Sequence, residues 1–227
     1  MAEKTSNSNK TIKSHITVIL DRTGSMEVIR DDTIGGFNTF LKQQKEEPGK
    51  ATMTLVQFDT QDPYEVIHQM TPIKDVPELT RKTYVPRAAT PLLDAMGRGI
   101  NDLDSILAKM EKKEKPSRIV MVIITDGQEN SSREFRKDQV EKMIREKTTE
   151  GWQFVFLSAD LGAIDEAMAT GVHAKSALAF DKDAQGTAAV WASASNKISA
   201  YRSGIKDEVS FDEEDRDKQK AEKKRKR

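Results

Sequence analysis

Residues 16–25 read ITVILDRTGS, and this stretch joins a short apolar run to a polar turn. The apolar part, residues 16–20, has the length of a buried strand, and the turn after it contains Gly24. Apolar side chains then recur at the spacing of one helix face over residues 34–41. The stretch therefore predicts a strand, a turn and a helix, which is the repeating unit of an α/β fold.

The same alternation continues along the rest of the chain. Further strands are expected at 53–58, 64–70, 119–124, 154–157 and 178–180, and further helices at 92–110, 133–149, 163–170 and 187–202. The continuously apolar run at 119–124 is typical of a strand buried on both faces. A polar turn at 59–63 indicates a hairpin, so the strand after it is expected to be an antiparallel edge. We predict a doubly wound α/β fold whose central sheet is mostly parallel, with helices on both faces.

The two ends of the chain differ from its centre in composition. A length of 227 residues suits one domain of ordinary size. Residues 1–13 are polar and are expected to form a flexible arm. From Lys206 onward an acidic block precedes a basic one, with Val209 and Phe211 as the only large apolar residues, and we interpret this part as a tail or a solvated helix, not as core. The domain is therefore placed at 14–204, followed by a charged tail at 205–227.

Composition excludes several classes of function. The 37 Lys and Arg residues balance the 37 Asp and Glu residues, so the chain has no global field that would attract nucleic acid or anionic lipid. There is no cysteine, which excludes disulfides, thiolate metal sites and a cysteine nucleophile. No apolar run approaches the roughly 20 residues of a membrane-spanning helix, and the polar start lacks the apolar region of a secretory signal. We expect a soluble cytoplasmic protein with no membrane partner.

Three polar clusters fall at one edge of the predicted sheet. They are DRTGS at 21–25, RAATP at 87–91 and TDG at 125–127. Ligands of open α/β sheets bind beyond the carboxyl ends of the strands, so these loops are expected to converge. If the strands before Asp21 and Asp126 are neighbours, two carboxylates meet there and need a positive charge beside them. Oxygen ligands without His or Cys suit a hard cation such as Mg²⁺, and an unsaturated ion recruits a ligand from outside, for which a partner's carboxylate is the natural candidate.

This combination resembles the metal-ion-dependent adhesion site (MIDAS) of von Willebrand factor A (vWA) domains. The resemblance rests on Asp-x-Thr-x-Ser at 21–25, on Thr90 ahead of a helix beginning Pro-Leu-Leu-Asp-Ala, and on Thr-Asp-Gly at 125–127. It spans about residues 14–204 and implies a Rossmann-like vWA fold. The chain departs from the family pattern at Thr23, where serine is usual but the hydroxyl is retained. It also departs at Ala88, where related sequences often have glycine, and we expect the alanine to stiffen the loop that carries Thr90 or to alter its reach.

The resemblance implies a binding module that holds Mg²⁺, with Mn²⁺ and Ca²⁺ as alternatives. The metal-binding residues that it implies are Asp21, Thr23, Ser25, Thr90 and Asp126. Ser25, Thr23 and Thr90 would be direct or near-direct ligands. Asp21 and Asp126 would act directly or through water. The implied partner is a protein that donates an Asp or Glu carboxylate. The chain is also similar to small stand-alone vWA-like proteins of bacteria and phages, several of which work beside MoxR-type AAA+ ATPases, so such an ATPase is the first partner to test.

Two other functions stay open at this point. An acid at a strand end beside Mg²⁺ also suits phosphoryl transfer, but the phosphatase pattern Asp-x-Asp needs an acid where the chain has Thr23, and there is no Walker motif. We therefore expect no enzyme and name no catalytic residue. The basic run at 223–227 would suit nucleic-acid binding, although a solvated tail, or pairing with the acidic residues at 212–217, is favoured.

Other conspicuous side chains receive structural interpretations. We interpret Arg22 as a solvated surface residue in preference to a contact for an acidic partner. Asp94 suits the first turn of its helix, where the helix dipole favours a negative charge. Asp160 is interpreted as the cap of the next helix. The three histidines share no metal-like spacing, and both tryptophans are expected to pack in the interior.

Overall fold

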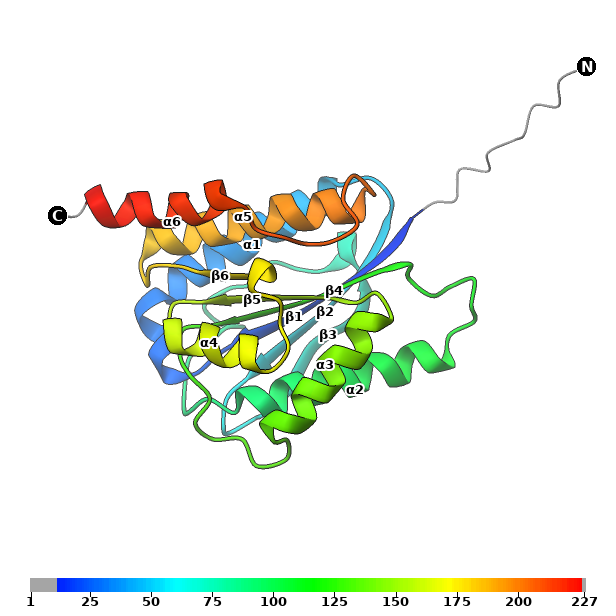
Figure 1. The fold of residues 1–227 in the computed structure, drawn as a ribbon, viewed down its shortest axis with the longest axis horizontal. Coiled ribbons are helices and arrows are strands. Elements are labelled where there is room, and N and C mark those ends of the chain that lie inside the picture. Colours follow the sequence, from blue (N-terminus) through cyan, green and yellow to red (C-terminus); the bar gives the residue numbers. More distant parts are fainter. Residues whose placement is uncertain (1–11, 226–227) are drawn as a thin grey trace, which may run out of the picture.

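The computed structural model describes residues 12–225, with side chains described as far as Gln219. The described chain forms one six-stranded sheet in the order β3-β2-β1-β4-β5-β6, covered by helices (Figure 1). The strands and main helices are β1 (Lys13–Asp21), α1 (Arg30–Glu46), β2 (Lys50–Phe58), β3 (Glu65–Pro72), α2 (Leu92–Lys109), β4 (Arg118–Thr125), α3 (Lys137–Thr149), β5 (Gln153–Ser158), α4 (Leu161–Ala169), β6 (Ala177–Ala179), α5 (Ala184–Arg202) and α6 (Glu213–Arg225). Short 3₁₀ helices lie at η1 (Gly24–Ile29), η2 (Ile73–Asp75) and η3 (Ala174–Ser176).

The sheet is parallel except for β3, which pairs antiparallel with β2 at one edge. The predicted doubly wound α/β fold is therefore confirmed, and so is the antiparallel edge strand. Strand β4 lies inside the sheet and is buried from residue 119 to its end, as its continuously apolar sequence predicts. Of the predicted arm at residues 1–13, only the last two residues lie in the described part, and Lys13 begins β1.

The hydrophobic core has two parts, one on each face of the sheet. On one face, side chains of α1 and α5 pack against alternate residues of the central strands, and α6 lies along this side (Figure 1). On the other face, α2, α3 and α4 contribute a second cluster. Two-sided burial leaves the strand ends as the place where polar loops can gather. Within the described residues, no helix combines the length and the apolar character that crossing a membrane requires.

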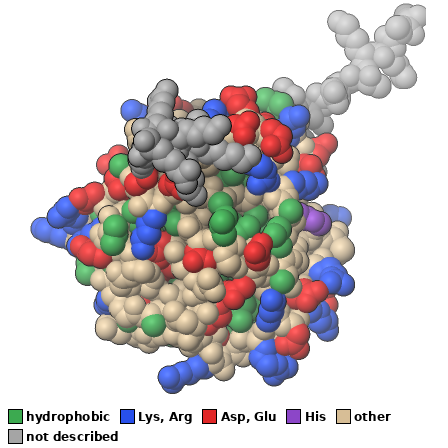
Figure 2. Space-filling view, turned by 60° about the vertical axis from the view of Figure 1, so that its left-hand side comes forward, with side chains coloured by type: hydrophobic (Ala, Val, Ile, Leu, Met, Phe, Trp, Pro, Cys, Tyr) green, Lys and Arg blue, Asp and Glu red, His purple; other side chains and the backbone are tan. Residues whose placement is uncertain are grey.

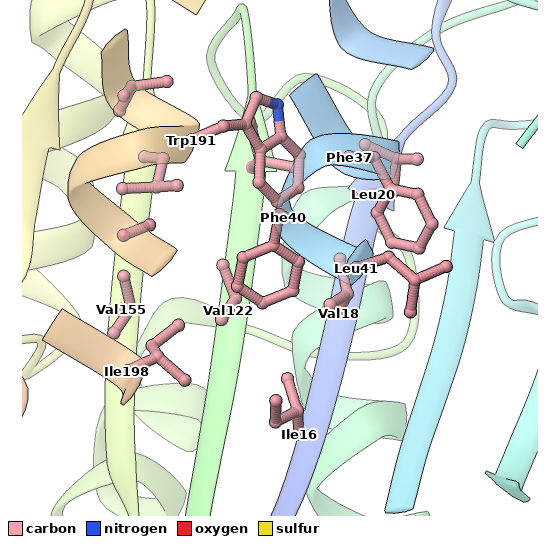
Figure 3. Close-up of a cluster of buried hydrophobic side chains, with 14 of the residues drawn as sticks. Ile16, Val18, Leu20, Phe37, Phe40, Leu41, Val122, Val155, Trp191 and Ile198 are labelled. Atoms are coloured by element: carbon pink, nitrogen blue, oxygen red, sulfur yellow. The ribbon is translucent and has the colours of Figure 1, made fainter. Parts of the chain in front are cut away.

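Helices α1 and α5 approach closely at a glycine. A Cβ atom built on Gly36 would lie 2.1 Å from Cδ1 of Trp191. The Trp191 ring centroid lies 5.9 Å from that of Phe37 and 5.4 Å from that of Phe40, and Figure 3 shows the indole between the two helices, next to Phe40. Only a residue without a side chain leaves room for the indole at this point. Both tryptophans of the chain are buried, as predicted.

This contact gives a stability prediction with a matched control. Gly36→Ala is expected to lower the free energy of unfolding by about 1–3 kcal/mol, because the new methyl group overpacks the indole. At the adjacent Gly35 a Cβ would meet nothing within 4 Å. Gly35→Ala is therefore expected to raise stability by about 0.5–1 kcal/mol, since alanine is the better helix former. Urea denaturation of both variants measures the difference, and equal effects of the two substitutions would contradict this packing.

The C-terminal part corrects one sequence interpretation. Val209 is fully buried and Phe211 is 5% exposed, so both belong to the core, where a tail or solvated helix had been expected. The backbone of this segment is tied to the region before β6: Ser176 Oγ donates to the Val209 carbonyl at 2.7 Å, and Phe211 N donates to the Lys175 carbonyl at 2.7 Å. Burial of these two apolar residues, together with the two hydrogen bonds, holds this strongly charged segment against the rest of the domain. The side chains of the basic run at 223–227 lie outside the described part.

Candidate metal site at the carboxyl edge of the sheet

Two of the predicted loops leave neighbouring strands. β1 pairs in parallel with β4, and Leu20 lies opposite Ile124, so the two strands end side by side. Asp21 is the last residue of β1, and Asp126 directly follows β4. Because both strands run in the same direction, both acids lie at the carboxyl edge of the sheet, as the sequence predicted.

Asp21 is a fully buried acid held by hydrogen bonds. Its Oδ1 accepts from the Thr23 backbone N at 2.7 Å, and its Oδ2 accepts from Thr125 Oγ1 at 2.5 Å. Burial raises the pKa of Asp21 to about 7, against these hydrogen bonds, which lower it, and the Asp126 charge raises it further. The ionised carboxylate is thus poorly stabilised at neutral pH. A bound cation would stabilise it.

Asp126 forms the second acidic part of the site. Its Oδ1 accepts from Ser25 Oγ at 2.6 Å, and Ser25 Oγ lies 3.2 Å from Thr23 Oγ1. Its Oδ2 is buried and accepts no hydrogen bond from the residues that the structure describes, although the Lys182 ammonium contacts it as an ion pair. The structure therefore brings Thr23, Ser25 and both acids into one hydrogen-bonded group.

Thr90 joins this group through the loop that carries Asp126. Thr90 is 4% exposed. Its backbone N donates to Asn130 Oδ1 at 3.0 Å, and the Asn130 backbone N donates to the Thr90 carbonyl at 3.1 Å. Asn130 thus fixes the threonine relative to the acid loop. Sequence analysis did not single out Asn130, since an asparagine in a polar loop carries no signal of its own.

The loop before Thr90 is also tied to the first loop of the site. Gly24 N donates to the Ala88 carbonyl at 3.0 Å, and Arg87 N donates to the Arg22 carbonyl at 2.9 Å. Ala88 has a φ of 59°, in the left-handed region that glycine adopts without penalty. An alanine held there costs about 1–2 kcal/mol of conformational strain. The position is therefore one where glycine fits better, in line with the family pattern from which Ala88 departs.

Arg22 is not the solvated surface residue that the sequence suggested. It is 5% exposed, and its Nε donates to Asp59 Oδ2 at 2.9 Å. Its Nη1 forms an ion pair with Glu65, and Arg87 Nε donates to the same Asp59 oxygen at 2.9 Å. The interpretation failed because the partners of Arg22 come from β3 and from the loop that follows β2. Arg22 therefore joins three loops and is not free to contact an acidic partner.

Asp59 is the centre of this ion-pair cluster. Burial raises its pKa, but hydrogen bonds from the backbone of Asp62 and Gln61 and from the Arg87 side chain outweigh burial, so the pKa of Asp59 is lowered. Asp59 is thus ionised and already paired. It differs in this respect from Asp21, which accepts hydrogen bonds but has no ion pair with a described Lys or Arg residue. We regard Asp59 as a residue that positions the loops and not as a metal ligand.

Two further acids have the structural roles that were expected of them. Asp160 caps α4, because its carboxylate accepts from Ala163 N at 2.9 Å. Asp94 lies in the first turn of α2, where it was placed, and its carboxylate also accepts from the backbone N atoms of three residues at 2.8–2.9 Å. These three are Arg133, Glu134 and Phe135. They had been predicted as helical, and α3 begins only after them, at Lys137.

The donors of the candidate site are all oxygen atoms. Among the described residues there is no group of three or more His, Cys, Asp or Glu side chains that could hold a metal. The site instead combines two carboxylates with hydroxyl groups, which suits a hard cation with a preference for oxygen. The raised pKa of Asp21 and the buried Oδ2 of Asp126 without a hydrogen bond both fit a divalent ion at this position.

Several solved structures are similar to this chain, although no protein-family model and no curated protein matches its sequence. Proximal thread matrix protein 1 (PTMP1) from the mussel byssus matches over 84% of this chain and 46% of its own, at 14% identity and a TM-score of 0.56. The pilus adhesin SpaC from Lactobacillus rhamnosus GG matches over 83% of this chain and 30% of its own, at 12% identity and a TM-score of 0.61. A von Willebrand factor type A structure from Catenulispora acidiphila matches over 82% of this chain and 42% of its own, at 12% identity and a TM-score of 0.55. This chain has the vWA fold.

The likeness at these identities concerns the fold alone. The chain spans less than half the length of each of these proteins. A further structure of PTMP1 has a zinc-occupied MIDAS motif and matches 86% of this chain and 45% of its own, at 14% identity and a TM-score of 0.51. The vWA fold thus agrees with the family resemblance that the three loop motifs indicated.

Proposed function

We propose that this chain is a metal-dependent protein-binding module of the vWA type. A divalent ion is held at the carboxyl edge of the sheet, and an Asp or Glu side chain of a partner protein completes its coordination. The residues that hold the ion are Asp21, Thr23, Ser25, Thr90 and Asp126. The ion is Mg²⁺, with Mn²⁺ and Ca²⁺ as alternatives. The supporting observation is a pair of buried acids joined by hydroxyl groups, in which Asp21 has a pKa raised to about 7 by burial.

The roles of the five residues follow from their surroundings. Asp21 and Asp126 supply the negative charge, and their burial keeps water from screening it. Ser25 and Thr23 supply neutral oxygens from the turn after β1, and Thr90 supplies a third from the loop fixed by Asn130. When bound, the ion would supply a fixed positive charge with a coordination position open to an outside oxygen.

The surroundings of the site favour a protein partner. Val28, in η1 directly after the first motif, is 76% exposed. Val85, at the start of the loop that leads to Thr90, is 45% exposed. Both side chains are therefore available for contact with a partner that docks over the site. The zinc-occupied MIDAS motif of PTMP1 supports divalent-ion binding on this fold.

The identity of the partner is a separate question. The resemblance to stand-alone vWA-like proteins makes a MoxR-type AAA+ ATPase in the cytoplasm of a bacterial cell the first candidate. Nucleic acid is the less favoured partner. Acidic and basic side chains are interspersed over the face shown in Figure 2, whereas binding to a phosphate backbone requires a concentrated basic surface.

The test is a pull-down from the native cell with the full chain as bait, in Mg²⁺ and again in EDTA. A partner retained by the wild-type chain in Mg²⁺ is expected to be lost in EDTA and with Asp21→Ala. Asp165→Asn, on the exposed side of α4, is the control and is expected to retain the partner. Binding that ignores both EDTA and Asp21→Ala contradicts the proposal. Hydrolysis of a phosphate ester that is lost in Asp21→Asn would point to phosphoryl transfer instead.

A further inference from the structure

A lysine from outside the three motif loops already contacts the candidate metal site. Lys182 lies in the turn between β6 and α5, and its ammonium forms an ion pair with Oδ2 of Asp126. The Asp126 side chain is fully buried, and within the described part of the chain the same Oδ2 accepts no hydrogen bond. In this arrangement the Lys182 ammonium offsets the charge of the buried Asp126 carboxylate.

The turn that carries Lys182 is fixed, while its side chain can move. Asp183 caps α5 by accepting from Gly186 N at 2.9 Å, and Asp183 N donates to the Asp181 carbonyl at 2.8 Å. A Cβ on Gly186 would lie 2.2 Å from that carbonyl oxygen, so the turn is closely packed. The Lys182 side chain, by contrast, is 33% exposed. Its long flexible stem allows the ammonium to move into water without moving the backbone.

A divalent ion and this ammonium cannot both lie against Asp126. Two positive charges a few Å apart repel strongly in a buried site, where the effective dielectric constant is low. A metal ion that binds Asp126 must therefore displace Lys182, and the loss of the ion pair reduces the net affinity for metal.

We propose that Lys182 is an internal counter-cation that competes with the divalent ion for Asp126 and thereby weakens metal binding. The inference rests on the proposed function, because it requires that the site binds metal. The exchange keeps Asp126 neutralised in both states: by the ammonium when metal is absent and by the ion when it is present. It also makes the position of the Lys182 side chain a reporter of metal binding.

The experiment is calorimetric titration of the full chain with MnCl₂ alone. Lys182→Met keeps the apolar stem and removes the charge, and we expect it to bind Mn²⁺ about tenfold more tightly than wild type, which corresponds to about 1.4 kcal/mol. Lys182→Arg keeps the charge and is expected to bind much as wild type does. The control is Lys175→Met, which removes an exposed lysine paired with Glu208 elsewhere on the surface and is expected to leave the affinity unchanged.

Thermal unfolding provides a second readout. In EDTA, Lys182→Met is expected to melt below wild type, because Asp126 loses its counter-charge, and added Mn²⁺ should raise its melting temperature by more than that of wild type. If wild type binds Mn²⁺ and Lys182→Met binds it equally or more weakly, the proposed competition between Lys182 and the ion is wrong, whereas the proposed metal site is retained. If neither protein binds Mn²⁺, the proposed function is wrong and the exchange is wrong with it.

Discussion

Replacement of Asp21 by asparagine is expected to weaken Mn²⁺ binding at least 100-fold. The substitution removes one of the two formal negative charges of the site and leaves the shape of the side chain nearly unchanged. Loss of a residue that only orients a metal ligand typically costs about 10–100-fold in affinity, so loss of a charged ligand should cost more. Calorimetric titration with MnCl₂ in a chloride buffer measures the effect.

The fold should tolerate this substitution. Thr125 Oγ1, which donates to Asp21 Oδ2, also lies 3.0 Å from the Gly127 carbonyl. The hydroxyl can therefore donate to that carbonyl and accept from the new amide group. Asp165→Asn is the matched control, because it removes an exposed acid of α4 and should leave Mn²⁺ affinity unchanged. Mn²⁺ binding of wild-type strength in Asp21→Asn would show that the ion, if bound, lies elsewhere.

The second prediction concerns the pH dependence of stability in EDTA. Burial raises the pKa of Asp21 to about 7 in the folded chain, from the ordinary aspartate value of 3.8. The folded protein therefore holds this proton more tightly than the unfolded chain does, and the stability that this proton contributes is lost as pH rises through the folded pKa. The loss between pH 4 and 8 amounts to about 4 kcal/mol, because each tenfold difference in proton affinity between the folded and unfolded chain is worth about 1.4 kcal/mol.

Asp21→Asn has no proton to lose at this position, so its stability should not show this decrease with rising pH. Urea denaturation in EDTA at several pH values is expected to show Asp21→Asn gaining stability relative to wild type as pH rises from 4 to 8. Saturating Mg²⁺ at pH 8 should stabilise wild type more than Asp21→Asn, because the ion binds the ionised wild-type site. A constant difference in stability between the two proteins across this pH range would contradict a raised pKa of Asp21 in the folded chain.

Much of the fold follows from local sequence. The apolar run of β4 is continuous because both faces of this strand are covered, and this pattern predicted its two-sided burial. The run in β1, which contains Thr17, predicted a buried strand by its length. Polar residues directly after such strands lie at its carboxyl edge by topology. The positions of Asp21 and Asp126 were therefore predictable, and hydrogen bonds through Thr23 and Ser25 join the two acids, in agreement with the predicted convergence.

The features that the sequence did not predict depend on contacts between distant segments. Arg22 pairs with Asp59 and Lys182 with Asp126, and neither pair has a spacing that a sequence pattern would reveal. Val209 and Phe211 are buried inside a charged stretch because they dock beside β6, whereas composition averaged over that stretch predicts exposure. Tertiary partners decided the outcome in each of these cases.

The central claim is that oxygens from three loops hold one divalent ion, and diffraction at the manganese absorption edge tests it most directly. Crystals of the full chain soaked in MnCl₂ are expected to show one strong anomalous peak beside Ser25 and Asp126, with metal–oxygen distances of about 2.0–2.2 Å. The Lys182 ammonium should then have left Asp126. An anomalous map without a peak at these loops, at a manganese concentration that saturates binding in solution, would contradict the account.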